Sequence, residues 1–170
     1  MILADWEIQN ACHDGLVVPF TEELLNPASL DVRLGAELLI EYAQNSDLVT
    51  YPLRFHTQAE PYLLKPGQFV LAQTIEVFNL PDNIAAEFRL KSSRAREGLD
   101  QALAVWADPG WHGSVLTMEL RNNRQLHPIP LWYGMRIGQM VFHRMSARPK
   151  QSYAKTGRYN GHRTVVGSLG

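Results

Sequence analysis

Apolar residues alternate with polar ones along most of this chain, which is the pattern of half-buried β-strands. Leu30, Val32 and Leu34 alternate with Asp31 and Arg33, for example. Similar stretches predict further strands over residues 36–42, 68–80, 84–90, 115–120, 128–131 and 135–145. On this pattern Leu116, Met118 and Leu120 share one face, and Val115, Thr117 and Glu119 share the other. Many short strands separated by turns indicate an all-β sandwich or barrel.

A helical period appears near the N-terminus. Residues 4–14 predict a short helix, with Asp5 as its cap and Gly15 at its end. One helical turn is further expected over 94–99, with Ser92 and Ser93 near its N-terminus. Pro149 ends the compact part, so we expect a β domain over 1–150 and a tail over 151–170 that orders as a flap over a ligand.

Composition narrows the class of protein. With 170 residues and 45% hydrophobic content, the chain is long enough for one domain with a real core. Its net charge of −1 argues against binding long nucleic acid by bulk charge, but leaves room for a small anion in a local basic pocket. Cys12 is the single cysteine, and we find neither a signal peptide nor a membrane-length apolar run. We therefore expect a cytoplasmic protein.

Three stretches are candidates for chemistry. The first is the basic and hydroxyl-rich segment Lys91-Ser92-Ser93-Arg94-Ala95-Arg96, whose donors and cations suit phosphate oxygens. On composition alone an ordinary charged surface loop is the simpler interpretation. The second is Glu119, a carboxylate between apolar neighbours, which suits proton transfer but also fits an exposed strand position.

The third is the turn Asp108-Pro109-Gly110, which needs no functional explanation by itself. The six histidines show no metal-ligand spacing, and the zinc deaminase signature is absent. The sequence also lacks a P-loop, a Gly-x-Gly-x-x-Gly motif and a Gly-x-Ser-x-Gly elbow.

Taken in order, these motifs resemble those of the dCTP deaminase family of the trimeric dUTPase-like superfamily. The resemblance covers nearly the whole chain and rests on several segments in register. They are Ile2–Ile8, Pro27–Gly35, Ser92–Leu99, Asp108–Gly113, Glu119–Asn122, Gly134–Met140 and Arg158–His162.

The resemblance implies a twisted β-barrel or jelly roll that forms a homotrimer with active sites between subunits. It implies hydrolysis of dCTP to dUTP and ammonia, for dUMP and dTTP synthesis, with no catalytic zinc and with Mg²⁺ bound to the substrate triphosphate. Feedback inhibition by dTTP would also be expected of the family.

Residue roles are carried over by position. Glu119 would be the general acid/base, with Ser92 and Arg96 near the water and the phosphates. Backbone groups around 102–107 and at Thr117 would read the base. The remaining substrate-binding positions are Lys91, Ser93, Arg94, Ala95, Asp108, Met118, Tyr153, Arg158 and His162.

The chain departs from the family pattern in places. Lys91 stands where Arg is usual, and Arg158 and His162 stand where Lys and Gln are usual. The segment between Gly98 and Asp108 is one residue short. Two alternatives follow. One is a bifunctional deaminase and pyrophosphatase, or a dUTPase, with Asp108 activating water at the α-phosphate; the other is a non-catalytic nucleotide-binding relative.

Overall fold

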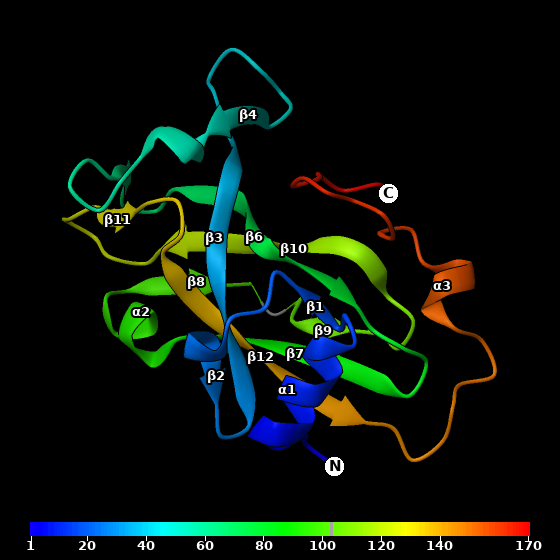
Figure 1. Cartoon of the computed structure of the whole chain (residues 1–170). Helices are drawn as coiled ribbons and strands as arrows, with labels where there is room; N and C mark the ends of the chain where they lie inside the picture. Colours follow the sequence, from blue (N-terminus) through cyan, green and yellow to red (C-terminus); the bar gives the residue numbers. More distant parts are fainter. Residues whose placement is uncertain (103) are drawn as a thin grey trace.

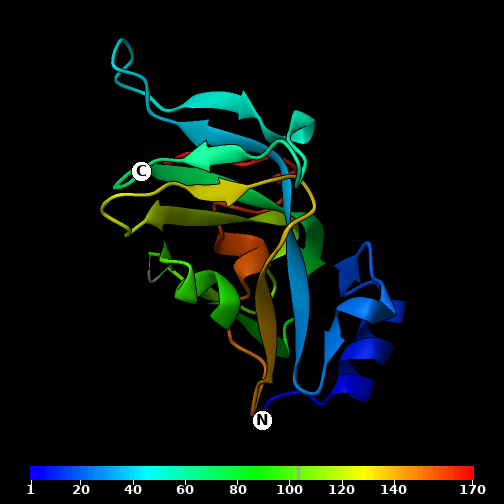
Figure 2. The same cartoon turned by 90° about the vertical axis from the view of Figure 1, so that its left-hand side faces the viewer.

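The computed structural model describes residues 1–102 and 104–170. Its longest strand, β3 (Ser29–Ile40), runs through two layers of sheet and joins them (Figures 1 and 2). The first half of β3 pairs with β12 (Arg136–Arg144), with Leu30 opposite Met140. The second half pairs with β6 (Phe69–Asn79), with Leu38 opposite Ala72. One strand thus belongs to both layers, which gives the curled, barrel-like sheet that the alternating pattern predicts.

The main sheet has the order β8-β10-β6-β3-β12-β7-β9, with β1 on β6 and with β2 and β4 on β3. A separate pair, β11 and β5, covers one end of the molecule. The remaining strand bounds are β1 Val17–Val18, β2 Leu25–Asn26, β4 Val49–Pro52, β5 Tyr62–Leu64, β7 Ile84–Leu90, β8 Leu99–Gln101, β9 Trp106–Ala107, β10 His112–Asn122 and β11 Ile129–Leu131.

Helices are few and short in the described residues. They are α1 (Asp5–His13), α2 (Ser92–Arg96) and α3 (Tyr153–Thr156), with two 3₁₀ turns at Glu22–Leu24 and Leu53–Phe55. The expected capping role of Asp5 is wrong: Ala4 is the N-cap, and its N–H donates to the Glu7 side chain at 3.1 Å. No helix in residues 1–102 and 104–170 is long and apolar enough to span a membrane.

The core lies between the two layers and under α1. Its largest fully buried side chains include Phe78, Phe88 and Phe142, and α1 adds Ile8 and Cys12. Burial raises the pKa of the Cys12 thiol to about 12, so it stays protonated as a small apolar side chain.

Buried carboxylates join strands inside this core. Glu76 on β6 has a fully buried side chain and accepts from the backbone N–H of Arg33 at 2.8 Å and from its Nε at 2.7 Å. Burial raises the pKa of Glu76, and the two Arg33 bonds oppose that rise. Asp31 lies on β3, as Arg33 does, and is paired with Lys91. Arg33 therefore ties β3 to β6, and Asp31 ties β3 to Lys91 at the start of α2.

Candidate functional site

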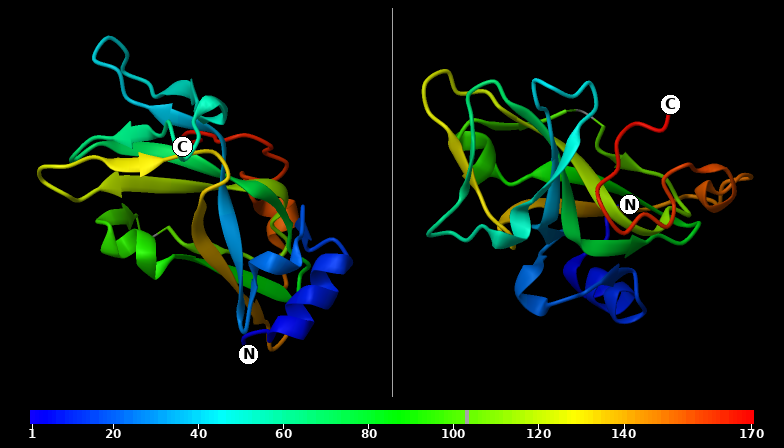
Figure 3. Two further views of the ribbon diagram at one scale, coloured as in Figure 1. Left: turned by 60° about the vertical axis from the view of Figure 1, so that its left-hand side comes forward. Right: turned by 90° about the horizontal axis from the view of Figure 1, so that it is seen from above.

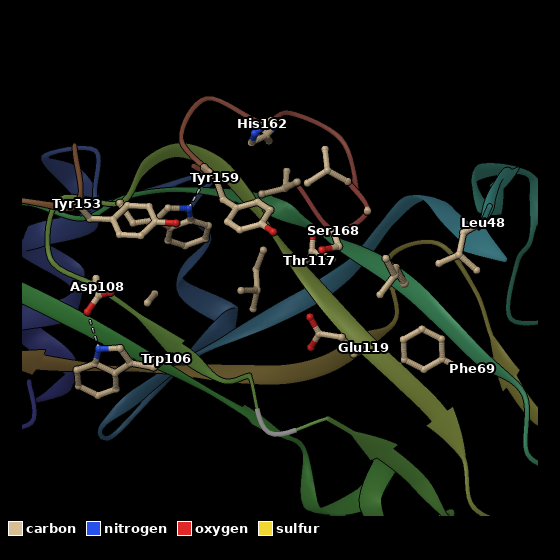
Figure 4. Close-up of a pocket in the computed structure, with 17 residues that line it drawn as sticks. Leu48, Phe69, Trp106, Asp108, Thr117, Glu119, Tyr153, Tyr159, His162 and Ser168 are labelled. Carbon is tan, nitrogen blue, oxygen red and sulfur yellow. Dashed lines mark hydrogen bonds between the residues drawn. The ribbon is translucent and has the colours of Figure 1, made fainter. Parts of the chain in front are cut away.

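A cavity of about 490 Å³ lies against β6 and β10, between these strands, the 106–111 turn and the C-terminal tail (Figure 4). Its walls are mostly apolar and aromatic. In Figure 4 the tail residues Tyr153, Tyr159 and His162 lie on one side, and Glu119 and Trp106 lie on the other. The full lining is Leu48, Phe69, Leu71, Trp106, Ala107, Asp108, Trp111, Val115, Leu116, Thr117, Glu119, Tyr153, Tyr159, His162, Val166, Gly167 and Ser168.

β10 aims Glu119 into this cavity. Met118 and Leu120 are fully buried in the core, so the residue between them must face the other way. The strict alternation expected over 115–120 is wrong at Leu116, which lines the cavity beside Thr117. The pairing of β10 with β6 shifts register between Val115 and Thr117, and this irregularity turns Leu116 outward.

Opposing effects set the pKa of Glu119. Partial burial raises its pKa above the ordinary 4.5, and a hydrogen bond from Gln101 Nε2 to Glu119 Oε2, 2.7 Å long, lowers it. The net direction is upward. A carboxylate with a raised pKa in a largely apolar cavity is suited to accept a proton and to return it.

Asp108 enters the same cavity from the turn after β9. Its Oδ1 accepts from the Trp106 indole N–H at 3.0 Å, and the side chain is otherwise exposed. Gly110 in this turn has φ +90°, and a Cβ there would collide with Ser152 of the tail. The turn that carries Asp108 thus requires glycine for close contact with the tail.

The tail is bound along the first part of β10. Tyr159 O accepts from Trp111 Nε1 at 2.9 Å and from Ser114 Oγ at 2.8 Å, and the Val115 N–H donates to His162 O at 2.9 Å. Val165 is buried, and its N–H donates to Gln73 Oε1 at 2.6 Å. These contacts hold Tyr159 and His162 at the cavity wall, and the Tyr153 N–H donates to Pro109 O at 3.1 Å.

The basic cluster 91–96 lies away from this cavity in the folded molecule. It forms α2, on the side of the molecule away from α3 and the tail (Figures 1 and 3). Lys91 Nζ is 2.6 Å from buried Asp31, and Arg94 pairs with Glu97 and lies over the Trp132 ring. Ser92, Ser93, Ala95 and Arg96 are exposed.

The structure therefore brings together only part of the predicted site. Asp108, Thr117, Glu119, Tyr153 and His162 line one cavity. Arg158 is exposed on the tail without lining it, and residue 103 of the expected base-reading stretch lies outside the described residues. The Met118 side chain is fully buried in the core and does not line the cavity.

Sequence reasoning missed several cavity residues and one residue outside the cavity that supports Glu119. Gln101 contacts Glu119 from β8, and Phe69, Leu48 and Ser168 complete the walls from distant segments. The alternating pattern of β6 places Phe69 on one face of the strand, but it does not show that this face lines a cavity. No group of three or more His, Cys, Asp or Glu side chains is placed to hold a metal ion within the two described ranges.

Known proteins match this chain over most of its length. The model of the family described as dCTP deaminase-like matches residues 2–145. Two relatives named "dCTP deaminase, dUMP-forming" are those of Tropheryma whipplei (strain Twist), 36% identical over 99% of this chain and 92% of the relative, and of Clavibacter michiganensis, 38% identical over 99% and 90%. A third of the same name, from Methanospirillum hungatei, is 39% identical over 84% and 81%.

Among solved structures, 2'-deoxycytidine 5'-triphosphate deaminase from Agrobacterium tumefaciens superposes with a TM-score of 0.68 at 23% identity. That alignment covers 83% of this chain and 47% of the other, so this chain spans about half of that protein. The structural likeness shows that this chain shares the fold of that deaminase, and the family match covers the strands that build the cavity. The chain belongs to the dCTP deaminase-like family.

Proposed function

We propose that this protein deaminates dCTP, with Glu119 as general acid/base. The observation that carries the proposal is the half-buried Glu119 carboxylate, whose pKa is raised by burial, in a cavity with mostly apolar walls. The family match and the names of the relatives supply the substrate. The lone cysteine and the nucleotide substrate both suit the cytoplasm.

In the proposed reaction the Glu119 carboxylate takes a proton from water as the oxygen attacks C4 of cytosine. The proton passes to N3. Glu119 then takes the second proton, from the new C4 hydroxyl, and passes it to the amino group, so that the tetrahedral intermediate collapses to the C4 carbonyl and the C4–N bond breaks to release ammonia. A base with a raised pKa serves both directions of proton transfer, because neither form is strongly favoured. The aromatic walls from Trp106, Trp111 and Tyr159 would exclude other water from the base.

The triphosphate needs cations, and among the residues that line the cavity there is neither lysine nor arginine. We propose that α2 of a neighbouring subunit supplies them, with Arg96, Ser92 and Ser93 as donors, in a homotrimer. The exposure of these side chains on α2, away from the cavity of their own chain, supports this arrangement. Mg²⁺ would accompany the triphosphate oxygens.

The end product is a second question, because the relatives are named dUMP-forming. We propose that dUMP is formed here too: dCTP and water give dUTP and ammonia, and dUTP and water give dUMP and pyrophosphate. Asp108 shares the cavity with Glu119, so one site holds two carboxylates for two hydrolytic steps. Asp108 would orient the water that attacks the α-phosphorus.

The variant Asp108→Asn tests whether Asp108 acts in the second step, the hydrolysis of dUTP. Incubated with dCTP and Mg²⁺, it should still release ammonia but accumulate dUTP, whereas the wild type should yield dUMP and pyrophosphate. Equal dUMP from both proteins would remove Asp108 from the second step. A parallel incubation of the wild type with dUTP tests the alternative. Release of dUMP from dUTP without any ammonia from dCTP would instead favour a dUTPase.

A further inference from the structure

We propose that Gln101 is a positioning residue for the reaction: its neutral side-chain amide holds the Glu119 carboxylate in place and leaves it able to accept a proton. The inference rests on the proposed role of Glu119 as base. Gln101 itself is absent from the cavity wall, so it acts through Glu119 and not on the nucleotide.

Both N–H groups of the Gln101 amide are used. Nε2 donates to Glu119 Oε2 at 2.7 Å and to the backbone oxygen of Ala102 at 3.0 Å. The opposite amide orientation would set the Gln101 oxygen against two acceptors, so the contacts fix the orientation. The side chain is only 9% exposed. A buried amide with both donors engaged is a rigid support for the carboxylate.

Backbone pairing fixes the distance between the two side chains. β8 pairs with β10 with Gln101 opposite Leu120, and the Ala102 N–H donates to Glu119 O at 3.0 Å. Gln101 is therefore bound to the strand that carries the base. Within the part of the chain that the structure describes, its amide is the one side-chain donor to the Glu119 carboxylate.

A neutral donor suits a residue that must change protonation. Arginine or lysine in this place would favour the carboxylate strongly and weaken it as a base, whereas an amide orients it with a smaller effect. The other titratable groups facing Glu119 across the cavity are Asp108, Tyr153, Tyr159 and His162. On the sheet, Arg121 and Asp100 form the next cross-strand pair. None of these six forms an ion pair or side-chain hydrogen bond with Glu119 in residues 1–102 and 104–170.

The test uses the full-length protein and three variants. Gln101→Met keeps the length of the side chain and removes the donor. Gln101→Leu also removes the donor without adding a charge, and serves as the second variant where the first folds poorly. Gln125→Met is the matched control, since Gln125 is exposed in the loop after β10. Thermal unfolding verifies that each variant is folded.

Two readouts are taken together. Ammonia release from dCTP gives kcat and KM against pH, and ¹³C NMR of labelled glutamate carboxyls gives the Glu119 titration. Loss of a hydrogen bond to a charged group predicts a fall in kcat of about tenfold to a hundredfold. KM should change by less than about twofold, because Gln101 does not touch the nucleotide. The acid limb of kcat and the Glu119 midpoint should both move to higher pH in Gln101→Met and Gln101→Leu, and not in Gln125→Met.

Other results would overturn the inference. An unmoved Glu119 midpoint in both Gln101 variants would show that the amide does not act on the carboxylate. A large rise in KM with kcat unchanged would show that Gln101 acts on the substrate. Wild-type protein that releases no ammonia would refute the proposed function alone, because the NMR titration reports the Gln101–Glu119 bond without turnover.

Discussion

Val165→Ala should release the C-terminal tail without unfolding the domain. Val165 is 6% exposed and packs with Leu39 and Leu71 in a small cluster apart from the main core. The substitution removes two buried methyl groups, worth about 0.8 kcal/mol each, or about 1.6 kcal/mol together. At 1.4 kcal/mol per factor of ten, the ratio of bound to released tail falls about fifteenfold.

Trypsin cleavage after Arg163 measures this release. Arg163 lies between the His162 backbone, which is bonded to Val115, and the Val165 anchor, so cleavage requires the segment to detach. When detachment and rebinding are faster than cleavage, the cleavage rate follows the released population. We expect cleavage at this bond to be about fifteenfold faster in Val165→Ala than in the wild type.

Leu169→Ala is the control, because Leu169 is in the same tail and 50% exposed. Its cleavage rate should match the wild type. Equal rates in all three proteins would refute the view that Val165 anchors the tail. A large fall in the unfolding temperature of Val165→Ala would show that the tail and the domain unfold together, which the separate cluster argues against.

Three further outcomes are expected. Arg33→Met leaves the fully buried Glu76 carboxylate without its ion partner and should cost about 3–5 kcal/mol, seen as a fall in the unfolding temperature; an unchanged temperature would contradict the role of this pair. Glu119→Gln should unfold at a higher temperature than the wild type at neutral pH. The raised folded-state pKa of Glu119 makes the wild type lose stability as pH rises through that pKa, so the difference should vanish below pH 4.5; a gap that persists there would have another cause. Arg96→Ala should weaken dCTP binding in calorimetry while leaving the proposed homotrimer intact. An unchanged affinity would show that α2 does not bind the triphosphate.

Local pattern predicted much of this fold, because strand alternation and turn chemistry depend on near neighbours. The helix at Asp5–His13, the strand at Ile84–Leu90 and the outward direction of Glu119 all follow from spacing alone. The cap at Ala4 was mispredicted because the donor to the Glu7 side chain is a backbone N–H, which any residue type supplies.

Contacts that depend on pairing register could not be read from the sequence. Gln101 reaches Glu119 only because three residues of β8 pair with the end of β10. The irregular pairing that turns Leu116 into the cavity likewise depends on where β6 and β10 meet. Separation of α2 from the cavity also depends on long-range pairing, because the chain after α2 first forms β8 beside β10, then β9 beside β7, and only then returns to β10.

The most direct test of the account is the fate of dCTP with purified wild-type and Glu119→Gln proteins in the presence of Mg²⁺, followed by chromatography of the nucleotides and an ammonia assay. We predict ammonia and dUMP from the wild type, and no ammonia from Glu119→Gln, which should still bind dCTP. Comparable ammonia release by the two proteins would contradict the central claim that Glu119 is the base.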